Sequence, residues 1–310
     1  MKWTEQYLFF PNSFQRIISI IFLPLTLIYC IVTTLKRVSA KPKYYGIPVI
    51  SIGNLLVGGT GKTPVTIALA KDKNYVGIVL RGSGRKSKGL YIISEKGKIL
   101  ENVNISGDEA MLLAISLPSA TVIVSENKSE AILKAKELGC KLVFLDDGYS
   151  KHGVYKFDLL LRPKLEPTNI FCLPSGGYRD AKMMYAFADC VLKEDVHFRR
   201  KVCFKNMQEE VVELPSDILL LTAISKPYRL LDYLPLDIPF ITYPDHYNFT
   251  QNDLDELERK YPNLAIVSTA KDMVKLKEIS INNDIYLMDL EVIINDEILN
   301  KVDDYIKILS

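Results

Sequence analysis

The chain has 310 residues, of which 48% are hydrophobic and 25% charged. This composition excludes a disordered chain, and the length suffices for about two domains with separate cores. A formal net charge of +2 gives no indication of nucleic-acid binding, and we expect neither a nucleic-acid nor a protein partner. The five cysteines and three histidines are scattered without zinc-site spacing, which fits a reducing compartment.

Residues 1–38 are predicted to form a hydrophobic helix that associates with a membrane. Residues 17–35 carry no charged side chain, and basic residues follow at 36–43. The length just suffices for a span of about 20 residues, but Pro24 and several polar residues equally fit a helix lying in the membrane interface. A secretory signal ending near Val38-Ser39-Ala40 is a third interpretation, which the preceding basic pair opposes. The basic residues favour a cytoplasmic main body.

The segment Gly53–Pro64 is predicted to bind the phosphates of a nucleoside triphosphate. It follows an apolar run at 47–52, expected as a buried strand, and precedes a helical pattern at 65–70. In such loops backbone amides bind phosphate oxygens, a lysine reaches the terminal phosphates, and a threonine hydroxyl coordinates Mg²⁺. We assign nucleotide contacts to Gly58, Gly59, Thr60, Gly61, Lys62 and Thr63, and place Thr63 on the metal as well.

This loop lacks the first glycine of the standard pattern, because Leu56 occupies that position. Its Gly58-Gly59-x-Gly61-Lys62-Thr63 form resembles the variant loops of metabolic kinases and of partitioning and nitrogenase-type ATPases. A glycine-rich turn without a ligand is the alternative, which the flanking strand and helix disfavour.

Strands and helices alternate after the loop. Strands are expected at 75–80, 121–124 and 141–145, helices at 108–117 and 129–138, and a hairpin at 90–101. The spacing predicts an α/β fold with a mostly parallel sheet and helices on both faces, and the phosphate-binding loop indicates the P-loop kinase type of this fold. The basic loop at 81–88 either contacts phosphate or is solvated.

Two adjacent carboxylates, Asp146 and Asp147, follow the apolar strand at 141–145. Ligands of parallel α/β sheets bind at the carboxyl ends of the strands, and a Mg²⁺-positioning acid of a nucleotide enzyme is expected at that edge. We therefore predict that these aspartates hold Mg²⁺. A simple turn after the strand is the alternative.

A second alternation fills the C-terminal part of the chain. Short strands are expected at 201–204 and 211–214, then strands at 217–222, 240–242, 264–268 and 285–288 with helices between them. We predict a nucleotide-binding domain at 39–194 and a smaller α/β domain at 195–310. The amphipathic segment 296–309 is expected to pack on one of the sheets, the first domain included.

Several separated motifs together resemble the tetraacyldisaccharide 4'-kinase family, the lipid A 4'-kinases of Gram-negative bacteria. In the family's order, they are Gly53–Pro64, Leu80–Arg85, Gly107–Ala110, Asp146–Tyr149, Leu173-Pro174 with Arg179-Asp180, Thr222–Pro227, Asp245-His246 and Thr269–Asp272. The resemblance implies ATP-dependent phosphorylation of the 4'-hydroxyl of a tetraacylated glucosamine disaccharide 1-phosphate in lipid A biosynthesis. It also implies ATP and Mg²⁺ as cofactors, the lipid A disaccharide precursor and inner-membrane lipids as partners, and the cytoplasmic face of the bacterial inner membrane as the location.

The family pattern implies four catalytic residues in this chain. Asp108 aligns with the base, His246 with its supporting histidine, Lys62 with the phosphate-binding lysine, and Arg179 with a phosphate contact. A carboxylate with a pKa of about 4 is a weak base, so a nearby imidazole helps to accept or stabilise the proton. Without the resemblance, His246 would be interpreted as a surface-loop histidine.

The chain departs from the family motifs at several positions. Asp180 replaces a glutamate, Ser150-Lys151 replace Gln-His, Ala110 replaces a proline, and Ala270 replaces a glutamate. None of these changes removes a group essential to phosphoryl transfer.

Other functional classes share parts of this pattern. A membrane-associated P-loop ATPase switch would use the same loop without transferring phosphate to lipid; such switches often carry an additional lysine where this chain has Val57. A GTPase is suggested by Asn300–Asp303, but this tetrapeptide falls inside the C-terminal helical pattern. A non-catalytic lipid-binding protein would leave the phosphate-binding loop without a purpose.

Overall fold

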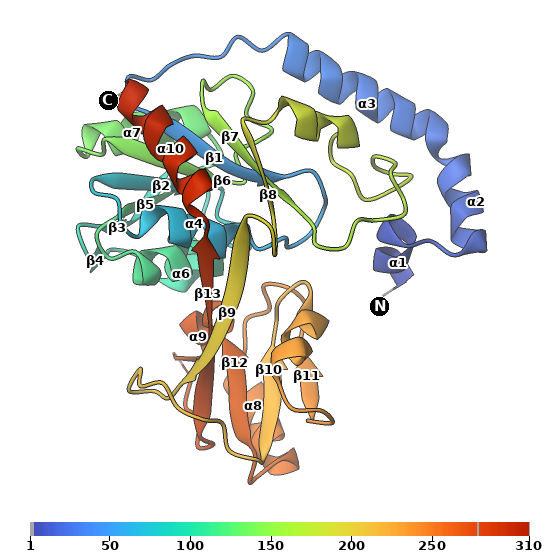
Figure 1. The fold of residues 1–310 in the computed structure, drawn as a ribbon. Helices are drawn as coiled ribbons and strands as arrows, with labels where there is room; N and C mark the ends of the chain where they lie inside the picture. Colours follow the sequence, from blue (N-terminus) through green and yellow to red (C-terminus); the bar gives the residue numbers. More distant parts are fainter. Residues whose placement is uncertain (1–2, 278, 310) are drawn as a thin grey trace.

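The structure, a computed structural model, describes residues 3–277 and 279–309; residues 1–2 of the expected N-terminal helix and residue 310 of the expected C-terminal domain lie outside this part. Figure 1 shows two sheets in separate parts of the molecule. We call the eight-stranded sheet with its helices the large lobe, and the five-stranded sheet with its helices the small lobe.

The sheet of the large lobe has the strand order β4-β3-β5-β2-β6-β1-β7-β8. Its strands are β1 (Val49–Asn54), β2 (Val76–Leu80), β3 (Tyr91–Glu95), β4 (Lys98–Ile99), β5 (Thr121–Val124), β6 (Leu142–Asp146), β7 (Phe157–Arg162) and β8 (Cys190–Lys193). Every pairing is parallel except those of β3 with β4 and with β5. The predicted mostly parallel α/β sheet is confirmed.

Helices cover both faces of this sheet because successive side chains of a strand point to opposite sides. One face, including Ile50 and Ile78, packs against α4 (Lys62–Ala70) and α6 (Asp108–Ser116). The other face, including Val49 and Val79, packs against α7 (Lys128–Glu137). A short helix, α5 (Val103–Ser106), precedes α6, and a 3₁₀ segment, η1 (Lys182–Phe187), precedes β8.

The sheet of the small lobe has the order β11-β10-β12-β13-β9. Its strands are β9 (Phe198–Lys205), β10 (Ile218–Thr222), β11 (Phe240–Thr242), β12 (Ala265–Thr269) and β13 (Ile285–Ile294). The helices α8 (Gln251–Lys260) and α9 (Ala270–Leu276) pack on one face, and residues of η2 (Pro227–Tyr233) on the other. The strand predicted at 211–214 is wrong: only Val211 makes an isolated bridge, to Lys205.

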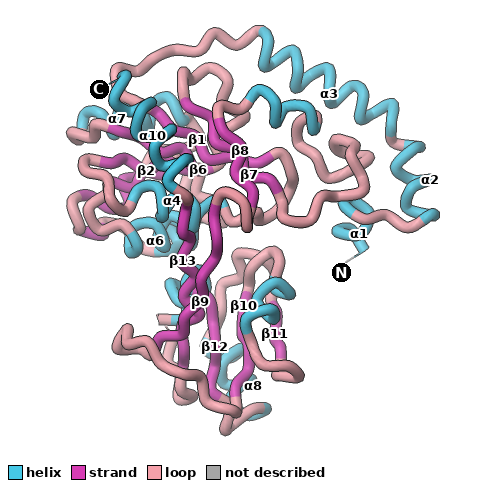
Figure 2. The backbone as a smooth tube through the Cα atoms, viewed as in Figure 1, coloured by secondary structure: helices cyan, strands magenta, loops and turns pink. Residues whose placement is uncertain are grey.

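Two long antiparallel strands, β9 and β13, connect the lobes (Figures 1 and 2). Their ends at Phe198 and Ile294 belong to the core of the large lobe. The chain then continues into α10 (Asp296–Leu309), which buries Ile298 and Val302 in that same core. The tetrapeptide at 300–303 therefore lies within a packed helix. The domain boundary at 194/195 stays a prediction.

The N-terminal region is not the continuous helix that the sequence predicts. It consists of α1 (Trp3–Phe9), α2 (Ser13–Ile21) and α3 (Leu23–Val38), seen at the edge of Figure 1. Asn12 caps α2 with a capping box, and Pro24, which has no amide hydrogen to donate, follows the break at Phe22. None of the described helices is by itself long and apolar enough to cross a bilayer. Only α2 and α3 taken together, with a 58° bend, reach the required length and composition.

Candidate functional site

The predicted phosphate-binding loop connects β1 to α4 at the carboxyl edge of the large sheet. Gly58 and Gly61 adopt φ angles of +88° and +81°, which glycine tolerates better than other residues. Gly61 caps the N-terminus of α4, whose first turn carries Lys62 and Thr63. Lys62 Nζ lies 3.4 Å from Asn54 Oδ1 and 3.7 Å from Asp147 Oδ1. The geometry suits a triphosphate bound against the amides of the loop and the helix N-terminus.

Asp146 ends β6 directly beside the loop. Thr63 Oγ1 donates a hydrogen bond of 3.1 Å to its Oδ2, whereas the buried Oδ1 has no hydrogen-bond partner. Burial, together with the negative charge of Glu109, raises the pKa of Asp146 to about 6. A buried carboxylate oxygen without a partner, next to a threonine hydroxyl, fits Mg²⁺.

No cluster of three or more metal-binding side chains occurs in the described ranges 3–277 and 279–309. This finding is compatible with Mg²⁺ at a nucleotide site, because Mg²⁺ there usually takes one or two protein ligands and completes its shell with phosphate and water.

Asp147 has a different environment from Asp146. Arg179 donates to both of its carboxylate oxygens, with NH1 at 3.0 Å and NH2 at 2.9 Å. Although burial opposes ionisation, this pair and the charge of Lys62 lower the pKa of Asp147 to about 2. The same guanidinium binds the carbonyl and side-chain oxygens of Asn54. Arg179 thus holds Asp147 and the end of β1 together.

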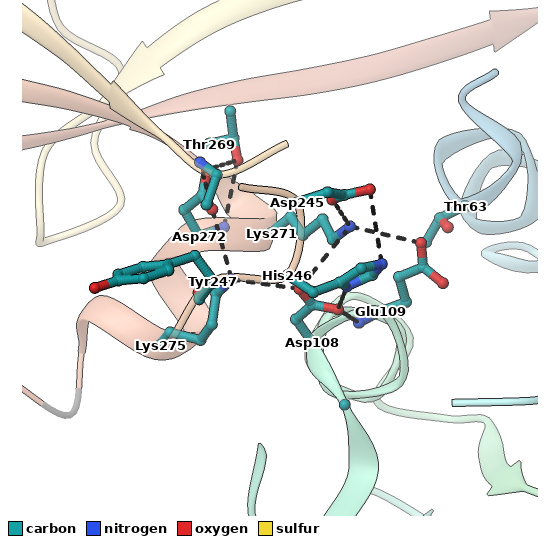
Figure 3. A network of polar contacts seen from close by, with 12 residues as sticks. Thr63, Asp108, Glu109, Asp245, His246, Tyr247, Thr269, Lys271, Asp272 and Lys275 are labelled. Atoms are coloured by element: carbon teal, nitrogen blue, oxygen red, sulfur yellow. Dashed lines mark hydrogen bonds and ion pairs between the residues drawn. The ribbon is translucent and has the colours of Figure 1, made fainter. Parts of the chain in front are cut away.

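A second polar centre lies where the two lobes meet (Figure 3). His246 Nδ1 of the small lobe is 2.9 Å from Oδ1 and 3.0 Å from Oδ2 of Asp108, the first residue of α6. Asp108 is buried, at 4% exposure, while the side chain of His246 is 25% exposed. His246 has a φ angle of +62°, which is uncommon for a residue with a side chain and often marks a functional position.

Two lysines of α9, in the small lobe, lie beside Asp108 (Figure 3). Lys275 Nζ is 3.3 Å and Lys271 Nζ 3.9 Å from Asp108 Oδ2. Burial would raise the pKa of Asp108, but the His246 hydrogen bond and the charge of Lys271 outweigh it and lower this pKa. The Asp108 hydrogen bond, in turn, raises the pKa of His246.

Charged side chains link the Asp108–His246 centre to the phosphate-binding loop. Lys271 Nζ lies 3.7 Å from Glu109 Oε1, and the charge of Glu109 acts on Asp146 at the phosphate-binding loop. The predicted residues Asp108 and His246 therefore adjoin the predicted nucleotide site, although they come from different lobes.

Comparison with known proteins gives consistent matches. Residues 18–307 match the family model of tetraacyldisaccharide-1-P 4'-kinases. The chain is 56% identical over 296 residues to the tetraacyldisaccharide 4'-kinase of Aliarcobacter butzleri, covering 96% of this chain and 94% of that protein. It is 40% identical over 303 residues to the Helicobacter acinonychis tetraacyldisaccharide 4'-kinase, covering 97% and 94%. The chain belongs to the tetraacyldisaccharide 4'-kinase family.

The fold agrees with a solved structure of the same family. A crystal structure of LpxK from Aquifex aeolicus in complex with ATP aligns with a TM-score of 0.75 at 26% identity, covering 94% of this chain and 99% of that one.

One departure from the family motifs has a local structural account. Asp180, the shorter acid, lies 3.7 Å from Arg37 NH2 of α3, and the guanidinium of Arg37 stacks 4.7 Å from the ring centre of Tyr149. The acid therefore pairs with the N-terminal region, whereas the neighbouring Arg179 pairs with Asp147.

Several residues near Asp108 and near the phosphate-binding loop were not assigned roles from the sequence. Lys271 and Lys275 stand four residues apart, and this spacing places both on one helix face, which is the signal that would have indicated them.

Lys128 is 5% exposed and donates to the carbonyls of Val79 and Asp146 at 3.1 and 3.5 Å. Burial lowers its pKa to about 7. In the basic loop Arg85 pairs with Glu126, and the role of this loop stays a prediction.

Proposed function

We propose that this protein transfers the γ-phosphate of ATP to the 4'-hydroxyl of a tetraacylated glucosamine disaccharide 1-phosphate. The observation that carries the proposal is the contact of 2.9 Å between Asp108 and His246, set beside a nucleotide-binding loop in a chain of this family. A switch ATPase needs the loop but has no use for a second, proton-accepting centre. Phosphoryl transfer needs both.

The loop supplies the phosphate donor. Its amides and Lys62 hold the β- and γ-phosphates, while Thr63 and Asp146 hold Mg²⁺. When bound, the metal neutralises phosphate charge. Of the two aspartates, we assign the metal contact to Asp146, because its Oδ1 has no other partner and Asp147 is occupied by Arg179. Lys62 and Arg179 both pair with Asp147, at 3.7 and 2.9 Å, so a phosphate held by Lys62 would have a second cation nearby.

The Asp108–His246 pair accepts the proton of the sugar hydroxyl. Asp108 is ionised at neutral pH because its pKa is lowered, and its carboxylate orients the imidazole through Nδ1. An imidazole held by a carboxylate is a stronger proton acceptor than either group alone, since the negative charge stabilises the imidazolium that forms. Lys271 and Lys275 keep the carboxylate in place.

We infer that α2 and α3 lie on the membrane that holds the acceptor lipid. Three of their polar side chains, Gln15, Ser19 and Thr26, are buried, and Thr26 Oγ1 donates to Ser175 Oγ at 2.7 Å. Their apolar side chains are exposed to solvent, including Ile17, Ile20, Ile21, Leu25, Leu27, Ile28, Ile31 and Leu35. A continuous exposed apolar surface of this kind is typical of a membrane contact. Inner-membrane lipids on the cytoplasmic side are the proposed partner.

The membrane-facing helices are connected to the nucleotide site. Tyr29 Oη of α3 donates to the carbonyl of Arg179 at 2.8 Å. A lipid whose acyl chains lie beside α3 is thus expected to bring its head group close to the transferred phosphate.

The direct test is phosphate transfer. Detergent-solubilised protein, ATP labelled at the γ-phosphate, Mg²⁺ and the disaccharide lipid are combined, and label in the lipid is measured after chromatography. We expect label in the lipid only when all components are present. ATP turnover that ignores the lipid, without labelled product, would favour the ATPase switch.

A further inference from the structure

The glycines of the phosphate-binding loop are covered by side chains from outside the large sheet. A Cβ atom added to Gly61 would lie 2.6 Å from Arg200 NH2, and one added to Gly59 would lie 2.4 Å from Ser225 Oγ. One added to Gly58 would lie 3.8 Å from Lys226 Cε. Arg200 belongs to β9, while Ser225 and Lys226 follow β10. The small lobe therefore packs directly on the loop.

Arg200 makes a polar contact in this interface. Its NH2 donates to the Thr60 carbonyl at 3.3 Å, and its side chain is only 9% exposed. Its Nε is buried without a hydrogen-bond partner and lies 3.5 Å from Glu194 Oε1. Glu194 also lies 3.7 Å from Arg229 NH2, so two guanidiniums share one carboxylate.

The contact with the Thr60 carbonyl has a consequence for the next amide. In a planar trans peptide, the carbonyl of one residue and the N–H of the next point in opposite directions. A guanidinium that fixes the Thr60 carbonyl on the small-lobe side therefore directs the Gly61 N–H to the other side of the loop. Loop amides that converge on one side are what binds a phosphate.

We propose that Arg200 is a positioning residue for nucleotide binding: from the small lobe, it holds the Thr60–Gly61 peptide in the orientation that presents the Gly61 amide to the triphosphate. The inference rests on the proposed function only in taking a nucleoside triphosphate as the ligand of the loop. No sequence motif indicated Arg200, because it stands 140 residues from Thr60 in the chain.

The test is the binding of Mg-ATP to Arg200→Met and Arg200→Lys, measured by isothermal titration calorimetry. Because a hydrogen bond from a charged group contributes to binding, we expect Arg200→Met to bind ATP about tenfold more weakly. Its turnover at saturating ATP should change by less than about threefold. Arg200→Lys keeps the charge but not the planar donor geometry, so an intermediate loss is expected. Adenosine, which lacks phosphates, should bind all three proteins equally.

Arg199→Met is the matched control, because Arg199 is the exposed neighbour on the same strand. It should bind ATP like the wild type, and thermal melting should show that each variant is folded. Unchanged ATP affinity in both Arg200 variants, an equal loss in Arg199→Met, or a loss of turnover without a loss of affinity would overturn the proposal. If ATP binding depends on Arg200 but the wild type phosphorylates no lipid, the proposed function is contradicted and this inference still stands.

Discussion

At the scale of single residues, the surroundings of Asp146 and Asp147 shift their pKa values in opposite directions. Burial raises the pKa of Asp146 to about 6, while the bidentate pair with Arg179 leads to a pKa of about 2 for Asp147. The sequence shows only two equal carboxylates after a strand. Their difference depends on Arg179, which arrives from a loop more than thirty residues later in the chain.

This difference leads to a prediction about Mg²⁺. Asp146→Asn should raise the Mg²⁺ concentration needed for half-maximal transfer more than Asp147→Asn does, because only Asp146 has an oxygen free of protein partners. The measurement is the rate of lipid phosphorylation over a Mg²⁺ titration at saturating ATP, after removal of metal with a chelator. A larger Mg²⁺ effect in Asp147→Asn would reassign the metal contact.

The Asp108–His246 pair predicts a dependence of stability on pH. The pKa of His246 is raised above its usual value of about 6.5 in the folded state, because protonated histidine is favoured beside the carboxylate. Its contribution to stability is therefore fully present below about pH 6.5 and is lost as the pH rises through the raised value. Asp108, whose pKa is lowered, stays ionised over this range.

The measurement is urea unfolding of the wild type and His246→Gln at several pH values between 5.5 and 9. The difference in unfolding free energy should be largest at the acidic end and should shrink with rising pH. His152→Gln is the matched comparison with the opposite sign: burial lowers the pKa of folded His152 to about 4, so the wild type should lose stability relative to this variant as the pH falls through the unfolded value of about 6.5. A difference for His246→Gln that is constant, or that grows with pH, would contradict the assigned ion pair.

At the scale of elements, the large sheet was predictable and the N-terminal helix was not. The core strands β1, β2, β5 and β6 are buried throughout, so short apolar runs separated by helical patterns indicate them. The strands β7 and β8 went unpredicted: the leucine run of β7 fits a helix equally well, and only every second residue of the four in β8 is buried, whereas all four residues of β5 are.

The N-terminal region shows why composition alone predicts a single helix. An apolar run of this length satisfies the length requirement, but hydropathy does not report where a chain bends. The inward positions of Ser19 and Thr26 depend on contacts with the loop that holds Asn169 and Ser175. These contacts join positions about 150 residues apart, which no local pattern describes.

The exposed apolar face of α2 and α3 gives the prediction at this scale. Ile20→Glu with Ile28→Glu places two charges on side chains that are 60% and 58% exposed, so folding should be little affected. Burying each isoleucine in lipid contributes about 1.5 to 3 kcal/mol, and the double variant should therefore bind anionic phospholipid vesicles at least about tenfold more weakly. Vesicle flotation is the measurement.

Leu133→Glu on α7 is the matched control for this experiment, because Leu133 is an exposed apolar residue, at 50%, on a helix of the large sheet. It should float with vesicles like the wild type. Undiminished flotation of the double variant would show that α2 and α3 do not hold the protein on the membrane.

At the scale of the whole molecule, the candidate site exists only because the two lobes meet. The nucleotide-binding loop and Asp108 belong to the large lobe, whereas His246, Lys271 and Lys275 come from the small lobe. The sequence places Asp108 and His246 138 residues apart, and only the family resemblance associated them. Lys271 lies in the motif Thr269–Asp272 but was given no role there, and Lys275 and Arg200 lie outside every motif, so their contacts required the structure.

In the proposed mechanism the Asp108–His246 pair serves the transfer step and not nucleotide binding. The most direct measurement compares lipid phosphorylation and Mg-ATP binding in the wild type and Asp108→Asn, with His152→Gln as the control and thermal melting as the check on folding. Loss of a positioned acid–base group typically costs about 10² to 10⁴ in rate, so turnover should fall by that factor while the ATP dissociation constant changes by less than about threefold. Equal losses of turnover and ATP affinity, or turnover that survives the substitution, would contradict the account.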